Sequence, residues 1–378
     1  MTQDRPRHLH SLDIARGIAA FAVVFWHWHH FFIVRLHLAA DFRPELQPMY
    51  RLFRLFYLHG QEAVSLFFSL SGFIFFWLFA ERIASGKLSL RQFFVHRLSR
   101  LYPLHLATLL IVAVMQPLFR AVNGSYFVFG WNDLTHFVLN LLLLSSIGRG
   151  NGMSFNGPSW SVSVEMTLYA IFFLYCAMTK PRLLSMTAVS LFAYLILGRY
   201  KPGLGAAVGA FFVGGCMAEL YSALTRDGAR TRLARSIAFG VLALSVALFI
   251  APAAVLDALP YLVTPGNEPD FLTVVLFPCG ILALALAEFV TPAIFARVAR
   301  ITRLGELSYA VYLIHFPLQL VLMLAFTRLG INTRVFYSPF ALVAFFVTLI
   351  ALGLLSHYQF EMPIQRWLRS RYDAERAT

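Results

Sequence analysis

The chain has 378 residues, of which 59% are hydrophobic and 13% are charged, and its mean hydropathy is +0.69. Soluble domains carry about a quarter charged residues, so this composition excludes an ordinary soluble domain and indicates a protein that crosses a membrane several times. The net charge of +13 does not indicate nucleic-acid binding, because basic residues gather in the cytoplasmic loops of membrane proteins. The three cysteines lie in apolar stretches without C-x-x-C spacing, so we expect neither a disulfide framework nor a zinc site.

Apolar segments close to the ~20 residues that a membrane-crossing helix needs recur along the whole chain. They lie at 17–36, 62–81, 100–119, 130–147, 160–179, 183–198, 203–222, 233–256, 270–290, 304–327 and 336–357. The fourth segment is the exception, because Asn132, Asp133, His136 and Asn140 leave it only a short apolar stretch.

The placement of the basic residues decides whether the fourth segment crosses. With a cytoplasmic N-terminus and a fourth segment that does not cross, 21 of the 31 Lys and Arg residues lie inside, whereas only 13 do if it crosses. The positive-inside rule favours the first arrangement. We therefore predict an all-α, polytopic membrane helix bundle with about ten transmembrane helices, one re-entrant or short helix and both termini cytoplasmic. We expect a single membrane domain over 1–378, with no appended soluble domain.

Arg16 and His27 are ionisable residues at the foot and in the middle of the first apolar segment. They are 11 residues apart, which in an α-helix is a rise of ~16 Å and about three turns, so both side chains face the same way. Ionisable groups at bilayer depth are costly and usually face the interior of the bundle. We therefore expect both residues to be functional, and we expect His29 and His30 to lie at the membrane interface.

Polar residues at helical spacing form seams on three further segments. The seams are Glu62, Ser65, Ser69 and Gly72; Ser161, Glu165 and Tyr169; and Ser308, Tyr312, His315 and Gln319. Small residues such as Ser69 and Gly72 commonly serve only close helix packing, and we favour that interpretation for these two. His315 is either a structural hydrogen-bonding group or a functional one.

Arg97 and Arg100 are three residues apart at the start of the third crossing helix, so they project from one face. Paired guanidinium groups bind phosphate well, and the alternative is ordinary positive-inside anchoring. The pair is not a P-loop, because no glycine-rich pattern accompanies it.

Five motifs in a fixed order resemble the membrane acyltransferase-3 family of bacterial O-acyltransferases, of the O-antigen or exopolysaccharide acetylase type. They are LDIARGIAAFAVVFWH, SLFFSLSGFIF, RLSRLYPLH, PSWSVSVEMTLY and LGELSYAVYLIHFPL, and the resemblance covers residues 12–366. It implies a multi-pass enzyme of the bacterial inner membrane. Such an enzyme moves an acetyl or other short acyl group from cytoplasmic acetyl-CoA to a hydroxyl of an extracytoplasmic or lipid-linked glycan. Met166 and Thr167 depart from the family pattern, which leaves the acceptor open.

The resemblance also implies roles for individual residues. By motif, the expected catalytic residues are His27 and Glu165, and the expected acetyl-CoA-binding residues are Arg16, Arg97 and Arg100. Apart from these, the expected substrate-binding residues, on or beside the polar seams, are Ser161, Tyr309, Tyr312 and His315. Burial in the bilayer favours an uncharged imidazole, which suits His27 as a general base. Glu165 either orients His27 or binds the acceptor. Direct transfer is favoured over an acyl-histidine intermediate, and no metal is expected.

A secondary transporter or a glycan-export protein is the alternative, because transporters also use buried charges. Many transporters are built from internal repeats, and the sequence shows none. The expected partners are the lipid bilayer, an acyl-CoA and a sugar acceptor, with no nucleic acid and no expectation for the oligomeric state.

Overall fold

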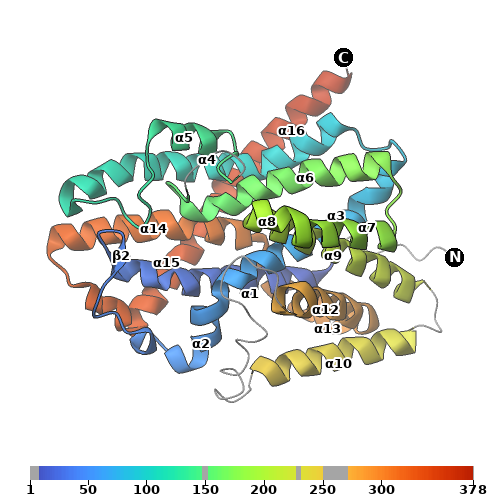
Figure 1. The fold of residues 1–378 in the computed structure, drawn as a ribbon, viewed down its shortest axis with the longest axis horizontal. Coiled ribbons are helices and arrows are strands. Elements are labelled where there is room, and N and C mark those ends of the chain that lie inside the picture. The colour runs from blue at the N-terminus through green and yellow to red at the C-terminus, as the bar shows by residue number, and fades with distance from the viewer. Residues whose placement is uncertain (1–7, 147–151, 227–230, 250–270, 378) are drawn as a thin grey trace. The chain divides into compact units, whose positions relative to one another are not determined.

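The computed structural model describes residues 8–146, 152–226, 231–249 and 271–377 and consists almost entirely of helices (Figure 1). The strands in the described ranges are β1 (Ile33–Val34) and β2 (His37–Leu38), which form a two-stranded antiparallel hairpin in which Val34 pairs with His37. The predicted all-α, polytopic fold class is confirmed.

The chain forms two compact units, each built from several separate stretches. The first contains Met1–Ala19, Glu62–Leu88 and Leu168–Glu306, and the second contains Ala20–Gln61, Ser89–Thr167 and Leu307–Thr378. Two helices, α1 (His10–Trp26) and α6 (Trp160–Met178), contribute residues to both units.

The other elements belong to one unit each, apart from the short turn η3 (Gly60–Glu62). The first unit holds α3 (Ala63–Ala84), α7 (Leu183–Phe192), η5 (Ala193–Leu197), α8 (Gly198–Tyr200), α9 (Pro202–Thr225), α10 (Thr231–Phe249), η8 (Leu272–Leu276), α12 (Phe277–Val290) and α13 (Pro292–Glu306). The second unit holds the hairpin, η1 (His27–Phe32), η2 (Pro44–Leu46), α2 (Tyr50–His59), α4 (Leu90–Asn123), α5 (Leu134–Leu141), η4 (Gly157–Ser159), α14 (Ser308–Leu329), η9 (Thr333–Tyr337), α15 (Pro339–Ser356), η10 (His357–Glu361) and α16 (Met362–Ala377).

Within the described residues, eight helical stretches are long and apolar enough to cross a membrane. They are Tyr50–Ala84, Leu90–Asn123, Gly157–Met178, Leu183–Tyr200, Pro202–Thr225, Leu272–Val290, Ser308–Leu329 and Pro339–Ala374. Each overlaps one of the ten segments expected to cross. The segment 17–36 differs because its α-helix ends at Trp26, and the segment 233–256 runs into residues 250–270, which lie outside the described ranges.

The fourth apolar segment forms only the eight-residue helix α5. Eight residues rise about 12 Å, far less than the ~30 Å of a bilayer core, so this helix does not cross. Asp133 caps its N-terminus by accepting a hydrogen bond from the His136 backbone N–H at 3.0 Å. That bond, together with one from the His136 ring, lowers the pKa of Asp133.

In the first unit, α3 and α9 approach so closely that glycines are required at their contact. A Cβ added at Gly72 of α3 would collide with the backbone carbonyl of Phe211, and one added at Gly214 of α9 would collide with that of Ser69. Ser69 and Gly72 therefore serve helix packing, as the sequence favoured.

In the second unit, α4 packs against α14 and α16, and α14 also packs against α15 (Figure 1). Helix α4 begins at Leu90, ten residues before the predicted segment, because the Ser89 hydroxyl caps it by accepting from the Gln92 N–H at 3.3 Å. Arg97 and Arg100 consequently lie two to three turns inside a helix, and their predicted place at a helix start was wrong.

Candidate active site

His27 lies where the first helix changes its geometry. The α-helix ends at Trp26, and His27 is the first residue of the 3₁₀ helix η1. This 3₁₀ helix is held in place by its neighbours, since the fully buried Trp28 donates from its indole N–H to the Phe336 carbonyl at 2.9 Å. The rings of Phe31 and Phe336 also stack with centroids 3.7 Å apart. The position of His27 is thus fixed by the packing of the residues that follow it.

The imidazole of His27 is hydrogen-bonded to a second histidine. His27 Nδ1 lies 2.9 Å from His315 Nε2, and the two rings are nearly parallel, at 12°. Gln319, one turn further along α14, donates from Nε2 to the His27 carbonyl at 2.9 Å, and its Oε1 lies 3.0 Å from His30 Nδ1. His315 and Gln319 are fully buried, whereas His27 is half-buried. The arrangement holds both the ring and the backbone of His27, while the residue as a whole remains partly accessible.

His30, expected near the membrane interface, faces the interior of the protein. Its side chain is buried, with 3% of its surface exposed, and it is bonded to Gln319. The 3₁₀ geometry of η1 turns this ring toward α14.

The hydrogen bond between the two rings links their tautomers, because one nitrogen must donate and the other accept. If His27 donates from Nδ1, its Nε2 keeps a lone pair and can accept a proton from a substrate. If His315 donates from Nε2, His27 carries its proton on Nε2 and cannot act as a base there.

The environment of His315 bears on which of these two tautomer arrangements the pair adopts. The ring of His315 lies beside the backbone carbonyls of Tyr312 and Val311, although Nδ1 makes no hydrogen bond of ordinary geometry with any described residue. A proton on Nδ1 of His315 would lie near these carbonyls and would leave Nε2 as the acceptor for His27.

A second group of hydroxyls joins η4, α6 and α14. The Tyr312 hydroxyl donates to the Pro158 carbonyl at 2.8 Å and lies 2.9 Å from Ser161 Oγ, which donates to it. The Tyr309 hydroxyl donates to the Leu101 carbonyl on α4. All of these predicted substrate-binding hydroxyls therefore already have partners within the protein.

Glu165 follows Ser161 by one turn of α6 and is half-buried. It lies close enough to Tyr312 for its charge to act on the phenol. The structure thus brings Ser161, Glu165 and Tyr312 together.

The arginine pair on α4 lies beside the last helix of the chain. Arg97 lies over the Phe93 ring, with Cζ 6.0 Å from its centroid, and both Arg97 and Arg100 are half-buried. Arg369 of α16 donates from Nε to Ser99 Oγ at 3.2 Å, and its charge interacts with that of Arg100. Three guanidinium groups therefore occupy one face of α4 and its contact with α16.

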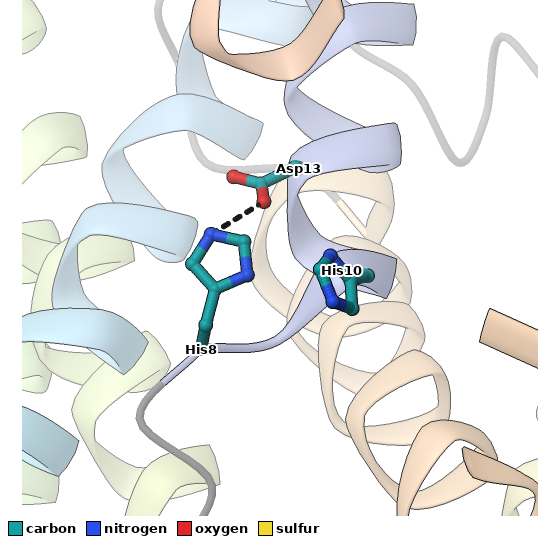
Figure 2. A group of neighbouring side chains, drawn as sticks. All are labelled: His8, His10 and Asp13. Atoms are coloured by element: carbon teal, nitrogen blue, oxygen red, sulfur yellow. Dashed lines mark ion pairs between the residues drawn. The ribbon is translucent and has the colours of Figure 1, made fainter. Parts of the chain in front are cut away.

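Arg16 belongs to the first unit, and its partner there is a carboxylate. Its Nη1 lies 3.7 Å from Asp13 Oδ1, while Asp13 Oδ2 lies 2.9 Å from His8 Nε2 (Figure 2). Burial raises the pKa of Asp13, and the nearby Arg16 charge partly offsets that effect.

Sequence reasoning placed Gln319 on a polar seam without giving it a role, and it missed His30 and Arg369. Helical spacing could have identified two of them. Gln319 follows His315 by four residues, and His30 follows His27 by three. Asn156 was also missed; it is buried and donates from Nδ2 to the Leu313 carbonyl at 3.0 Å, two residues before His315 in α14.

Long apolar helices indicate a multi-pass helical membrane protein, and the hydrogen-bonded pair of His27 and the buried His315 gives one of its units a polar site. The family model described as an acyltransferase domain matches residues 9–357. The protein named acyltransferase MdmB from Streptomyces mycarofaciens is 31% identical to this chain over 282 residues, which are 68% of this chain and 67% of that protein. No solved structure matches. The chain belongs to the membrane acyltransferase-3 family, and the resemblance inferred from its motifs is confirmed.

Proposed function

We propose that this acyltransferase moves an acetyl group, or another short acyl group, from acetyl-CoA to a hydroxyl of an extracytoplasmic or lipid-linked glycan. The observation that carries the proposal is the hydrogen bond between His27 and the buried His315, in a chain of this family. The proposal includes a bacterial inner-membrane location with both termini cytoplasmic.

In this mechanism His27 is the general base. Its Nε2 takes the proton of the acceptor hydroxyl as the oxygen attacks the thioester carbonyl and a tetrahedral intermediate forms. The C–S bond then breaks, the ester is released, and the thiolate of CoA takes the proton back from His27. A well-placed base of this kind contributes about 10²- to 10⁴-fold in rate.

We assign His315 a positioning role in place of the expected substrate contact. Its Nε2 is occupied by His27 Nδ1, so it fixes the ring and selects the tautomer that leaves His27 Nε2 able to accept a proton. Since His315 orients His27, Glu165 is assigned to the acceptor side, together with Ser161, Tyr309 and Tyr312.

The donor side is assigned to the arginines. Arg97 and Arg100 would bind the phosphates of CoA, for which paired guanidinium groups are well suited. Arg16 is assigned to the same cofactor.

The proposal is tested with the purified protein in lipid nanodiscs and acetyl-CoA, by following the appearance of free CoA thiol. We expect slow release without an acceptor, faster release when a glycan acceptor is added, and a mass increase of one acetyl group on that glycan. An absence of thiol release with acetyl-CoA and with longer acyl-CoA donors would contradict the proposal.

The donor side has its own test. The double variant Arg97→Ala/Arg100→Ala should weaken acetyl-CoA binding by tenfold or more in a titration followed by thermal shift, because two charge-assisted contacts are lost. Arg120→Ala is the matched control, since Arg120 lies on the same helix and contacts the Tyr126 hydroxyl at 3.1 Å. Equal affinity in the double variant and the control would remove the arginines from the donor side.

A further inference from the structure

Three potential metal ligands meet at the start of α1, in the first unit. His8, His10 and Asp13 each offer one ligand atom, and these atoms all lie within 4.8 Å of one another (Figure 2). We propose that His8, His10 and Asp13 bind a divalent transition-metal cation of the Zn²⁺ type. This site is separate from acyl transfer and uses none of the residues assigned to it.

The ligand set suits such a cation. Two imidazole nitrogens and one carboxylate oxygen are ligands that Zn²⁺ accepts, with the remaining positions left to water. In a tetrahedral zinc site with bonds of 2.0–2.2 Å, neighbouring ligand atoms are about 3.4 Å apart. His8 Nε2 and Asp13 Oδ2 are already 2.9 Å apart, and the His8 side chain is 53% exposed, so small side-chain rotations would complete the geometry.

The two carboxylate oxygens of Asp13 face different partners. Its Oδ1 faces Arg16 at 3.7 Å, whereas Oδ2 faces His8. The residue is only 6% exposed, and Oδ2 is buried, without a hydrogen bond of ordinary geometry to any described residue. A cation bound between Oδ2 and His8 Nε2 would therefore satisfy this buried oxygen and leave the contact of Oδ1 with Arg16 in place.

The local charge also favours a cation, although the chain as a whole has a net charge of +13. Glu288 of α12 accepts hydrogen bonds from the His10 and Ser11 backbone N–H groups at 3.0 and 2.8 Å. Glu306 is close enough for its charge to act on Asp13. The carboxylates of Glu288 and Glu306 thus lie close to the cluster in addition to that of Asp13.

The structural consequence would be a cross-link at the beginning of the first helix. His8 precedes α1, His10 is its first residue, and Asp13 lies in its first turn. A bound cation would join the three and stabilise the folded state in proportion to its affinity.

The test is a titration of the full chain, purified in detergent with a tag that contains no histidine and stripped with EDTA. Zn²⁺ binding is measured by calorimetry, and Co²⁺ binding by the visible absorption that reports nitrogen and oxygen ligands. We expect one equivalent to bind with micromolar or tighter affinity, and His8→Ala and His10→Ala each to weaken it by tenfold or more.

His37→Ala is the matched control, because His37 is an exposed histidine in the hairpin of the other unit. It should leave both titrations unchanged. The proposal would be overturned if binding survived either His8→Ala or His10→Ala. It would also be overturned if the wild type bound no stoichiometric metal at concentrations up to about 100 times a micromolar Kd. Thermal unfolding of each variant without metal checks that it is folded, since neither ring is part of a packed core.

Discussion

Two regions of this protein use small and polar residues on helix faces for different purposes. In the first unit, Ser69 and Gly72 of α3 allow the backbone of α9 to approach closely. In the second unit, His315 and Gln319 of α14 hold the ring and the carbonyl of His27. In the sequence both are polar seams with helical spacing. The difference is that packing depends on the absence of side-chain atoms, whereas the histidine cluster depends on specific nitrogen and oxygen atoms.

The largest effect is expected at His27. His27→Ala should reduce acyl transfer by about 10²- to 10⁴-fold, because the acceptor hydroxyl loses its general base. The measurement is the rate of CoA release with a glycan acceptor present. The variant should keep its melting temperature to within a few degrees, since the ring is half-buried and accepts no backbone hydrogen bond that the fold depends on.

His37→Ala is the control for loss of an unrelated histidine, and its activity should equal that of the wild type. If His27→Ala transferred acyl groups at the normal rate, the cluster around His27 would be structural, and the contrast between the two regions would disappear.

The packing region should respond to the smallest side-chain addition. Gly214→Ala places a Cβ against the backbone carbonyl of Ser69, which no side-chain rotation can relieve. Overpacking costs about 1–3 kcal/mol and sometimes more, so we expect a loss at the upper end of that range, measured by thermal unfolding in detergent.

Gly280→Ala is the matched control on α12 of the same unit. A Cβ there would meet nothing within 4 Å, and alanine is favoured over glycine in helices by about 1 kcal/mol. Gly280→Ala should therefore be neutral or stabilising. Equal destabilisation by both substitutions would show that the α3–α9 contact is not specially close.

Much of the fold was readable from the sequence, because long apolar segments must be helices in a bilayer. The charge pattern also identified the fourth segment as one that does not cross. The sequence did not show where the first α-helix ends, since His27 and His30 continue an apolar run with no proline or glycine to mark a change. It also misplaced the start of α4, because the Ser89 cap lies in a polar stretch before the apolar segment.

The site was predicted less completely than the fold. Motif resemblance pointed to His27 and His315 separately, but no spacing rule links residues 288 positions apart. The H-x-H-x-x-D spacing of His8, His10 and Asp13, the residues of the proposed metal site, is visible in the sequence but was given no role. Arg369 lies beyond the residues that the family model matches, 9–357, so motifs of the family had no bearing on it.

Variants of His315 test whether this residue orients the ring of His27 or only packs against it. His315→Ala should lower the rate of transfer by about 10- to 100-fold with little change in the KM for acetyl-CoA, because His27 loses its orientation and not its substrate. His315→Gln should restore part of the rate, since its side-chain amide can accept a hydrogen bond from His27 Nδ1. If Gln and Ala gave the same rate and the same melting temperature, the hydrogen bond would have no part in catalysis.

The smallest effects are expected at the hydroxyl pair of Tyr312 and Ser161. Tyr312→Phe removes the donor to the Pro158 carbonyl and the acceptor for Ser161, and a lost hydrogen bond in a buried place costs about 1–3 kcal/mol of stability. Ser161→Ala should cost less, because Tyr312 keeps its bond to Pro158. The double variant should cost less than the two single losses added together, since they share one hydrogen bond. If these hydroxyls also bind the acceptor, the KM for the glycan will rise in both variants while that for acetyl-CoA stays constant. A change in thermal stability alone would make this group a structural one, closer in kind to the α3–α9 contact than to the histidine pair.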